Sequence, residues 1–309
     1  MSPQKTVLVS DAIAEAGVAK LRTAGFTVDV KTGLKPEAIA PIIGNYDAWI
    51  VRSDTKATKD LIGKGSRLKV IARAGVGLDN VDTKAAESRG IRVLNTPGAT
   101  SISVAEHAIG LMLALYRHIP EADRTMRSGA WEKKRFEGRE LNGKTLGLVG
   151  LGRIGQEVAK RAIALGMKVI ANRSRVTKAS DDLSALGIRV LPLERLLPQS
   201  DIVSLHCPLT DTTRGLINAP TLGLMKKGAI LVHCARGGVV DEAALGKALR
   251  SGHLGGAALD VFPEEPVKGT HPLSGIENVI LTPHLGASTA EGQDRAGEEV
   301  ADLVIEALG

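Results

Sequence analysis

The chain has 309 residues, of which 43% are hydrophobic, 24% are charged and 2% are aromatic, and its formal net charge is +6 at pH 7. This is more residues than one hydrophobic core usually contains, and it fits two domains. The composition is that of a globular protein with an aliphatic interior. A mild positive charge favours anionic small molecules. No basic stretch is interleaved with aromatic residues, which argues against nucleic acid as a partner.

The two cysteines, Cys207 and Cys234, are not part of a C-x-x-C motif. They cannot form a disulfide framework, and they indicate a reducing compartment, the cytoplasm. The N-terminus lacks a basic segment followed by an apolar run, so no signal peptide is expected. The longest apolar helix candidate is interrupted by Glu106 and His107 and is too short to span a bilayer. We expect neither a membrane partner nor a metal site.

Strand-type and helix-type segments alternate along the chain, which predicts parallel sheets with helices on both faces. In the first half a helix is expected over 12–24, and strands are expected over 6–10, 26–30, 48–52, 68–72 and 91–94. In the second half a helix is expected over 290–308, and strands are expected over 146–149, 168–171, 189–191, 202–206, 230–234, 257–260 and 279–281. The predicted fold class is therefore α/β, with two doubly wound parallel-sheet domains, the second of them a Rossmann domain that binds a dinucleotide.

Two helix starts can also be predicted. Residues 101–118 read as a long helix with Ser101 or Ser103 as its N-cap. Ser288 and Glu291 have the spacing of a capping box before the final helix.

Gly150, Gly152 and Gly155 form a G-x-G-x-x-G motif between a short apolar strand and a helix that ends at Gly166. In a β-α-β unit the first glycine permits the tight turn, the second lets the backbone approach a pyrophosphate, and the third lets helix and strand pack closely. The helix N-terminus then faces the negative charge. The motif predicts a dinucleotide site; the alternative is a glycine-rich turn without a ligand.

The segment after the second strand of that unit is basic: it reads Asn172-Arg173-Ser174-Arg175. Arg173 lies 18 positions after Gly155, close to where an NAD-binding fold usually has an acid for the ribose 2′-hydroxyl. An acid there would repel a 2′-phosphate, whereas guanidinium groups bind phosphate oxygens in pairs. The segment favours NADP(H), and the alternative is a solvated basic loop.

Three reactive side chains each follow a predicted strand late in the chain: Arg236, Glu265 and His284. Ligands of open parallel sheets bind beyond the carboxyl ends of the strands, so all three side chains could reach one cleft. In the oxidation of a 2-hydroxy acid, His284 would accept the hydroxyl proton, Glu265 would stabilise the charged imidazole, and Arg236 would grip the substrate carboxylate.

These segments resemble the D-isomer-specific 2-hydroxyacid dehydrogenases. The strings are Val-His-Cys-Ala-Arg-Gly-Gly at 232–238, Ala-Leu-Asp-Val-Phe-Pro-Glu-Glu-Pro at 258–266 and Thr-Pro-His-Leu-Gly-Ala-Ser-Thr at 282–289. N-terminal signatures at 51–56, 73–82 and 95–106, with the stretch 131–136, are most similar to those of the phosphoglycerate dehydrogenases in that family. The resemblance covers almost the whole chain.

The resemblance implies roles for particular residues. It makes Arg236, Glu265 and His284 the catalytic arginine, glutamate and histidine. Arg153 and Ile154 would contact the cofactor pyrophosphate beside the three glycines, and further cofactor contacts would come from Cys207, Cys234, Ala235, Asp260 and Gly286. The substrate would meet Arg236 and His284 and, from the first domain, Arg52, Ser53, Gly75 and Val76.

The resemblance also implies the organisation of the protein. A discontinuous substrate-binding domain would comprise 1–98 and 287–309, and the nucleotide-binding domain would comprise 99–286. Family members are homodimers through the nucleotide-binding domain, and a Lys133–Arg135 loop could reach the partner's active site; the alternative for that loop is a solvated turn. Because the chain ends soon after the His284 motif, we expect no C-terminal regulatory domain and no serine feedback through one.

Three functions follow as hypotheses. The first is oxidation of D-3-phosphoglycerate or reduction of 3-phosphohydroxypyruvate, the first step of serine biosynthesis, which the basic residues Arg52, Lys56 and Lys133–Arg135 favour. The second is an NADPH-dependent glyoxylate or hydroxypyruvate reductase, which Arg173 favours because phosphoglycerate dehydrogenases usually have an acid there. The third is a dinucleotide-sensing corepressor, against which the phosphoglycerate-type signatures argue.

Overall fold

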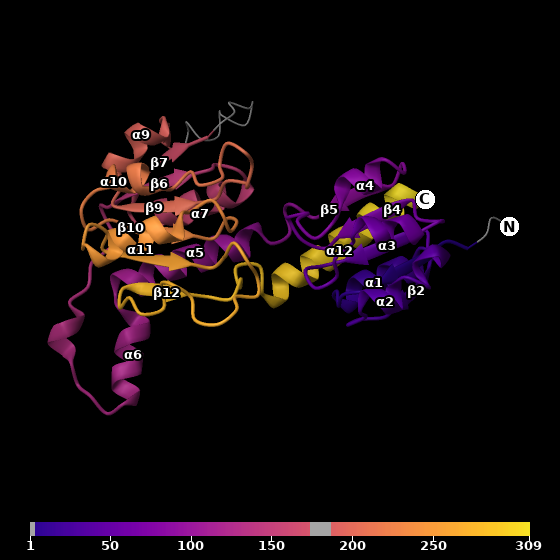
Figure 1. Ribbon diagram of the computed structural model, residues 1–309, viewed down its shortest axis with the longest axis horizontal. Helices are drawn as coiled ribbons and strands as arrows, with labels where there is room; N and C mark the ends of the chain where they lie inside the picture. Colours follow the sequence, from indigo (N-terminus) through magenta and orange to yellow (C-terminus); the bar gives the residue numbers. More distant parts are fainter. Residues whose placement is uncertain (1–3, 174–186) are drawn as a thin grey trace. The chain divides into compact units, whose positions relative to one another are not determined.

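The computed structural model describes residues 4–173 and 187–309 and divides the chain into two compact units (Figure 1). Unit 1 comprises residues 1–101 and 287–309, and unit 2 comprises residues 102–286. The chain therefore leaves unit 1, builds unit 2 and returns to unit 1 for its last helix.

Unit 1 is built on a five-stranded parallel sheet with the strand order β2-β1-β3-β4-β5. Each strand is short, and β1, β3 and β4 are almost entirely buried, as expected for a sheet that is covered on both faces. The strands are β1 (Thr6–Val9), β2 (Thr27–Val30), β3 (Ala48–Val51), β4 (Val70–Arg73) and β5 (Arg92–Asn95).

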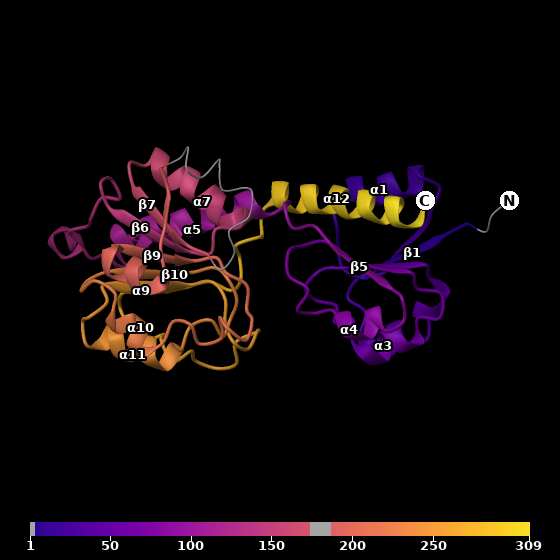
Figure 2. The ribbon, with the colours of Figure 1, turned by 90° about the horizontal axis from the view of Figure 1, so that it is seen from above.

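Two helical layers cover this sheet (Figure 2). The helices α1 (Glu15–Thr23) and α12 (Ala290–Leu308) lie side by side on one face, and α3 (Lys59–Lys64) and α4 (Thr83–Glu87) cover the other face. Alternate residues of β1 enter the two cores: Val7 and Val9 pack with α1 and α12, and Leu8 packs with the opposite layer. The remaining short helices of the unit are α2 (Pro36–Ile39) and η1 (Ile43–Asn45).

Unit 2 is built on a seven-stranded parallel sheet with the strand order β12-β11-β10-β9-β6-β7-β8. The order reverses at β6, which lies between β9 and β7, and such a switch point is where open α/β sheets bind their ligands. The strands are β6 (Thr145–Val149), β7 (Lys168–Asn172), β8 (Arg189–Val190), β9 (Ile202–Leu205), β10 (Ile230–His233), β11 (Gly256–Leu259) and β12 (Val279–Leu281).

Helices cover both faces of this sheet as well (Figure 2). The long helix α5 (Ser101–Tyr116) and α7 (Arg153–Ala164) lie on one face, and α10 (Ala219–Gly223) and α11 (Glu242–Arg250) lie on the other with α9 (Leu193–Leu196). The helix α6 (Ile119–Arg127) and the short η2 (Lys133–Phe136) extend away from the sheet (Figure 1), and α6 has no buried residue. The short η4 (Leu197–Gln199) follows α9.

The predicted fold class, two doubly wound parallel-sheet units, is confirmed by the two sheets. Two predicted helix starts are wrong. The helix α5 begins at Ser101 itself, so neither Ser101 nor Ser103 precedes it as the N-cap. The N-cap of α12 is Thr289, whose hydroxyl accepts a hydrogen bond from the Gly292 amide at 3.1 Å, and not Ser288. Both residues can cap a helix, so the sequence pattern alone could not choose between them.

The close contact of α1 with α12 depends on two glycines. A Cβ atom on Gly17 would lie 2.2 Å from the carbonyl oxygen of Gly297, so the two helix backbones meet where no side chain fits. This contact ties the last helix of the chain to its first helix.

We expect Gly17→Ala to destabilise unit 1 by about 1–3 kcal/mol, the usual cost of forcing extra atoms into a packed site. Gly63→Ala is the matched control, because Gly63 is exposed in α3 and a Cβ there would have no described atom within 4 Å. That change should be neutral or stabilise the unit by up to about 1 kcal/mol. Urea unfolding of both variants measures the difference, and equal stabilities would show that the helices can separate without cost.

Candidate active site

The glycine motif forms the turn between β6 and α7 at the switch point of unit 2. Gly150 has φ +101°, and a Cβ on it would lie 2.6 Å from the backbone of His206. A Cβ on Gly155 would lie 2.4 Å from the carbonyl oxygen of Gly150. A Cβ on Gly152 would have no described atom within 4 Å, so this glycine is not required by packing of the protein itself. The space in front of Gly152 fits the close approach of a pyrophosphate.

The other residues predicted at this turn are placed beside it. Arg153 is exposed at the first turn of α7, and Ile154 is half-buried. Arg173 directly follows β7, where the carbonyl of Asn172 accepts from the Gly150 amide at 2.9 Å. The Nε atom of Arg173 is buried and has no hydrogen-bond partner among the described residues. Two further predicted cofactor residues, Ser174 and Arg175, lie outside the described residues.

The three predicted catalytic residues follow three neighbouring strands. Arg236 comes after β10, Glu265 after β11 and His284 after β12, and these strands pair in that order in one parallel sheet. The turn after Arg236 packs against the segment that leads to Glu265, because a Cβ on Gly237 would lie 1.9 Å from the carbonyl oxygen of Phe262. The Nη1 atom of Arg236 donates to the Ala235 carbonyl at 2.7 Å.

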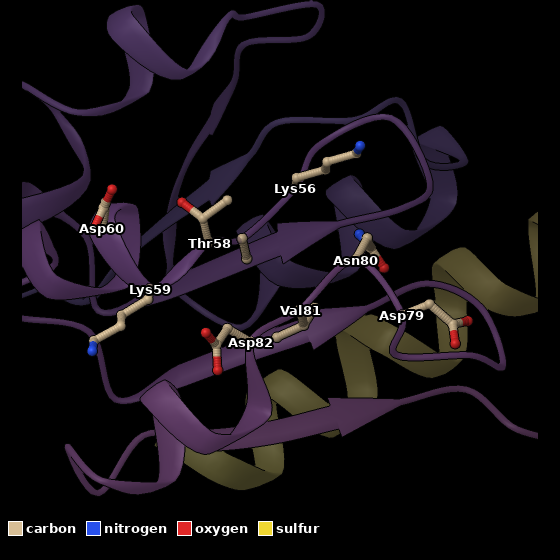
Figure 3. A pocket seen from close by; sticks show the side chains of 9 residues that line it. Lys56, Thr58, Lys59, Asp60, Asp79, Asn80, Val81 and Asp82 are labelled. Atoms are coloured by element: carbon tan, nitrogen blue, oxygen red, sulfur yellow. The ribbon is translucent and has the colours of Figure 1, made fainter. Parts of the chain in front are cut away.

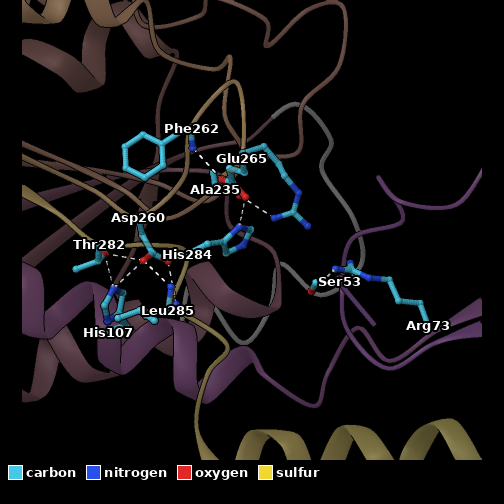
Figure 4. Close-up of polar contacts among 12 residues, drawn as sticks. Ser53, Arg73, His107, Ala235, Asp260, Phe262, Glu265, Thr282, His284 and Leu285 are labelled. Carbon is cyan, nitrogen blue, oxygen red and sulfur yellow. Dashed lines mark hydrogen bonds and ion pairs between the residues drawn. The ribbon is translucent and has the colours of Figure 1, made fainter. Parts of the chain in front are cut away.

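Glu265 and His284 form a hydrogen-bonded pair (Figure 4). The Oε2 atom of Glu265 lies 2.6 Å from Nδ1 of His284, and its Oε1 accepts from the Phe262 amide at 2.9 Å. Burial raises the pKa of the Glu265 carboxyl, but the hydrogen bonds from His284 and from the Phe262 amide outweigh burial and hold that pKa below its usual value. The carboxylate thus faces Nδ1, and Nε2 of His284 is left for a substrate.

The loop that carries His284 is held by a buried carboxylate. His284 has φ +55°, which is uncommon for a residue other than glycine. The next two amides, of Leu285 and Gly286, donate to Asp260 at 2.8 and 2.9 Å, and the Thr282 hydroxyl donates to it at 2.6 Å (Figure 4). Burial raises the pKa of Asp260, but these donors and His107 outweigh burial and lower the pKa.

His107 is a member of this network that sequence reasoning did not single out. Its Nε2 atom lies 3.2 Å from Oδ1 of Asp260 and 3.2 Å from the Thr282 hydroxyl. In the sequence His107 only interrupts an apolar helical run, and no pattern within α5 pairs it with residues so distant in the chain.

The buried side chains of Cys207, His233 and Cys234 and the half-buried His206 line the carboxyl ends of β9 and β10. Burial raises the pKa of the Cys207 and Cys234 thiols, so both remain protonated at neutral pH. Burial lowers the pKa of His206 to about 3 and that of His233 to about 4, so both imidazoles are neutral. The buried Ala235 completes this uncharged wall.

Unit 1 places its predicted substrate residues on two loops. Arg52 and Ser53 follow β3, and Gly75 and Val76 follow β4. Arg73 connects the two loops: its Nε donates to the Arg52 carbonyl at 3.3 Å, its Nη2 lies 3.4 Å from the Ser53 hydroxyl (Figure 4), and its Nη1 donates to the Gly77 carbonyl. The Arg52 guanidinium donates to the Ala12 carbonyl at 3.0 Å.

A pocket of about 500 Å³ also lies in unit 1 (Figure 3). It is lined by the segments 56–60 and 79–82, which a bridge between Ala57 and Val81 joins, and its charged side chains are of both signs. Apart from Lys56, which the sequence analysis named as favouring a phosphorylated substrate, it contains none of the residues predicted for catalysis, cofactor or substrate.

Within residues 4–173 and 187–309, no group of three or more histidine, cysteine, aspartate or glutamate side chains is arranged to hold a metal ion. No helix in these ranges is long and apolar enough to cross a membrane.

The Lys133–Arg135 loop is tied to its own unit by its last residue. Arg135 forms ion pairs with Glu121, with Glu132 at 2.9 Å and with Glu277 at 3.3 Å. Lys133 and Lys134 are exposed.

Known proteins resemble the chain throughout its length. Residues 109–286 match the family model "D-isomer specific 2-hydroxyacid dehydrogenase, NAD binding domain". The chain is 48% identical over 303 residues to a D-3-phosphoglycerate dehydrogenase of Methanocaldococcus jannaschii, which covers 98% of this chain and 57% of that protein. It is 49% identical over 278 residues to a hydroxypyruvate reductase of Thermotoga maritima, which covers 89% of each.

A solved structure, the TT0316 protein from Thermus thermophilus, superposes with a TM-score of 0.87 at 39% identity and covers 97% of this chain and 96% of that one. The chain spans little more than half the length of the phosphoglycerate dehydrogenases it matches. The family model covers more than half of the chain, and the relatives cover nearly all of it. The chain therefore belongs to the family of D-isomer-specific 2-hydroxyacid dehydrogenases.

Proposed function

We propose that the protein transfers a hydride between a nicotinamide cofactor and a D-2-hydroxy acid, with D-3-phosphoglycerate and 3-phosphohydroxypyruvate as its substrate pair. The observation that carries this proposal is the hydrogen bond between Glu265 and Nδ1 of His284, because it leaves a second imidazole nitrogen for proton transfer. This arrangement is that of a general acid-base catalyst.

Each catalytic residue has one task in this proposal. In the reduction of a keto acid, protonated His284 gives its Nε2 proton to the carbonyl oxygen, and in the oxidation of a hydroxy acid it takes that proton back. Glu265 stabilises the charged imidazole and fixes its tautomer. Arg236 pairs with the substrate carboxylate and orients the carbon that exchanges hydride with the bound nicotinamide.

In this proposal, unit 2 binds the cofactor and unit 1 contributes substrate contacts. Unit 2 carries the cofactor residues, including Gly152 and Arg153 at the turn and the uncharged wall of Cys207, Cys234 and Ala235. Asp260 and Gly286 lie at the same edge of the sheet, next to His284. Unit 1 carries the substrate residues Arg52, Ser53, Gly75 and Val76.

We further propose that the cofactor is NADP(H). The support is Arg173, whose buried Nε lacks a partner among the described residues next to the glycine turn. A 2′-phosphate would supply the missing acceptor. NAD(H) remains the alternative cofactor.

The second candidate function is the NADPH-dependent reduction of hydroxypyruvate or glyoxylate. Arg173 and the similarity to the hydroxypyruvate reductase of T. maritima favour it. The basic side chains of unit 1 and the exposed Lys133 and Lys134 favour the phosphorylated acid. A dinucleotide-sensing corepressor can keep the arginine, glutamate and histidine as well, so the phosphoglycerate-type signatures are what argue against that third function.

We propose that the protein is a cytoplasmic homodimer joined through unit 2. The support is the extension formed by α6 and η2, which exposes Ile119, Met126 and Trp131 by 53%, 53% and 80%. Exposed apolar side chains on one extended segment are typical of an interface. The two free cysteines fit a reducing compartment.

The test of the substrate is kcat/KM for the reduction of 3-phosphohydroxypyruvate and of hydroxypyruvate, each with NADPH and with NADH. We expect the phosphorylated acid to be preferred, because exposed basic side chains stabilise its phosphate. A preference for hydroxypyruvate with NADPH would establish the second candidate. No turnover of either acid would overturn the first candidate, and no turnover of glyoxylate as well would overturn the second.

We expect His284→Ala to lower kcat by about 10²–10⁴, the usual contribution of positioned acid-base catalysis, with little change in cofactor affinity.

Glu265→Gln tests the pair through pH. Burial raises the pKa of Glu265, but hydrogen bonds outweigh burial and lower the pKa, so its charge persists to a lower pH than that of an ordinary carboxyl. In the wild type, kcat/KM should fall as the pH drops through the pKa of Glu265 and the carboxylate takes up a proton. Glu265→Gln should lower kcat/KM and lack this acid-side fall, and an unchanged kcat/KM would contradict the pairing.

Arg173→Asp should weaken the binding of NADPH far more than that of NADH, because the change removes a phosphate partner and adds a repulsive charge. Fluorescence titration of each cofactor gives the two dissociation constants. Arg189→Asp, at an exposed position on the neighbouring β8, is the charge-matched control. Equal losses for both cofactors would show that Arg173 does not select the phosphate.

A further inference from the structure

Asp11 follows β1 at the carboxyl edge of the unit 1 sheet, and its side chain is almost fully buried. One carboxylate oxygen, Oδ2, accepts hydrogen bonds from the amides of Arg52 at 2.5 Å and Thr55 at 3.1 Å. The other, Oδ1, accepts from the Thr55 hydroxyl at 2.6 Å. A buried carboxylate is costly unless such donors surround it, so these three contacts determine where the loop from Arg52 to Thr55 lies.

Asn80 holds the same two residues from their carbonyl side. Its side-chain amide donates to the Arg52 carbonyl at 2.6 Å and to the Thr55 carbonyl at 2.7 Å. Asn80 lies between this loop and the pocket shown in Figure 3, which it also lines. The backbone of Arg52 and of Thr55 is therefore bonded on both sides, by two side chains that come from different strand-to-helix connections.

These contacts leave the middle of the loop exposed. Ser53 and Asp54 are exposed, and the Ser53 hydroxyl lies 3.4 Å from Nη2 of Arg73 (Figure 4). We propose that Asp11 and Asn80 are positioning residues, which hold the loop so that Ser53 and Arg73 meet the acid substrate in a fixed geometry. This rests on the proposed function in one respect, namely that this loop faces the substrate.

The chain offers a matched control at the other end of the same strands. Asp47 is buried to the same extent as Asp11, each being 5% exposed. Its carboxylate also accepts three hydrogen bonds: from the amide and the hydroxyl of Thr6, at 2.9 and 3.1 Å, and from the Arg67 guanidinium, at 2.8 Å. Because Thr6 and Asp47 lie at the amino ends of β1 and β3, Asp47→Ala removes comparable contacts far from the loop.

The experiment compares Asp11→Ala, Asn80→Ala and Asp47→Ala in the full chain. We expect the first two to raise KM for the keto acid by about ten-fold or more, with a smaller fall in kcat, because a displaced binding group costs affinity and orientation. Asp11→Asn, which keeps an acceptor for the two amides, should lie between Asp11→Ala and the wild type. The cofactor dissociation constant should stay unchanged in all of them, and Asp47→Ala should lower Tm without changing KM.

A second measurement does not depend on turnover. Hydrogen exchange of residues 52–56 should be faster in Asp11→Ala and Asn80→Ala and unchanged in Asp47→Ala. If the exchange changes as expected but KM does not, the loop does not position substrate and the proposal fails. Equal rises in KM in Asp11→Ala and Asp47→Ala would also overturn it, as a general loss of stability in unit 1. A wild-type protein that turns over neither keto acid would instead refute the proposed function.

Discussion

The carboxylate of Asp260 accepts hydrogen bonds from the backbone of Leu285 and Gly286, and the rest of the candidate site depends on this interaction. His284 has a backbone conformation that is uncommon for its residue type, and the two donors that follow it hold that conformation. With the loop fixed, the imidazole stays within hydrogen-bond distance of Glu265. A general acid-base catalyst needs this fixed orientation more than it needs any one contact.

An aspartate whose carboxylate accepts hydrogen bonds from backbone amides occurs at both edges of both sheets. At the carboxyl edges, Asp11 and Asp260 hold the loops that carry candidate functional residues. At the amino edges, Asp47 accepts from the Thr6 amide and Asp201 accepts from the Thr145 amide, so each first strand is fixed at its start. Aspartate suits these positions because a short side chain reaches adjacent backbone, and its charge strengthens each hydrogen bond.

Charge near the candidate active site of unit 2 is confined to a few groups. Burial keeps His206 and His233 neutral and both cysteine thiols protonated, so the wall beside the glycine turn carries no charge. Glu265 and Asp260 are ionised because hydrogen bonds outweigh their burial. An uncharged wall next to a charged acid-base pair suits a nicotinamide ring, which is flat and largely apolar, beside a site of proton transfer.

The sequence by itself determined the two parallel sheets, because alternating strand and helix patterns are local and repeat along the chain. It also indicated the glycine turn and the strand ends at which Arg236, Glu265 and His284 lie, since these patterns span only a few residues. Tertiary structure alone decided which residues hold the loops: Asp11 meets Thr55, and His107 meets Asp260, across separations that no local pattern encodes. Folding also brings three carboxylates to Arg135. The N-cap of α12 is Thr289 and not Ser288, because a cap depends on which backbone amide folding brings within reach of the side chain.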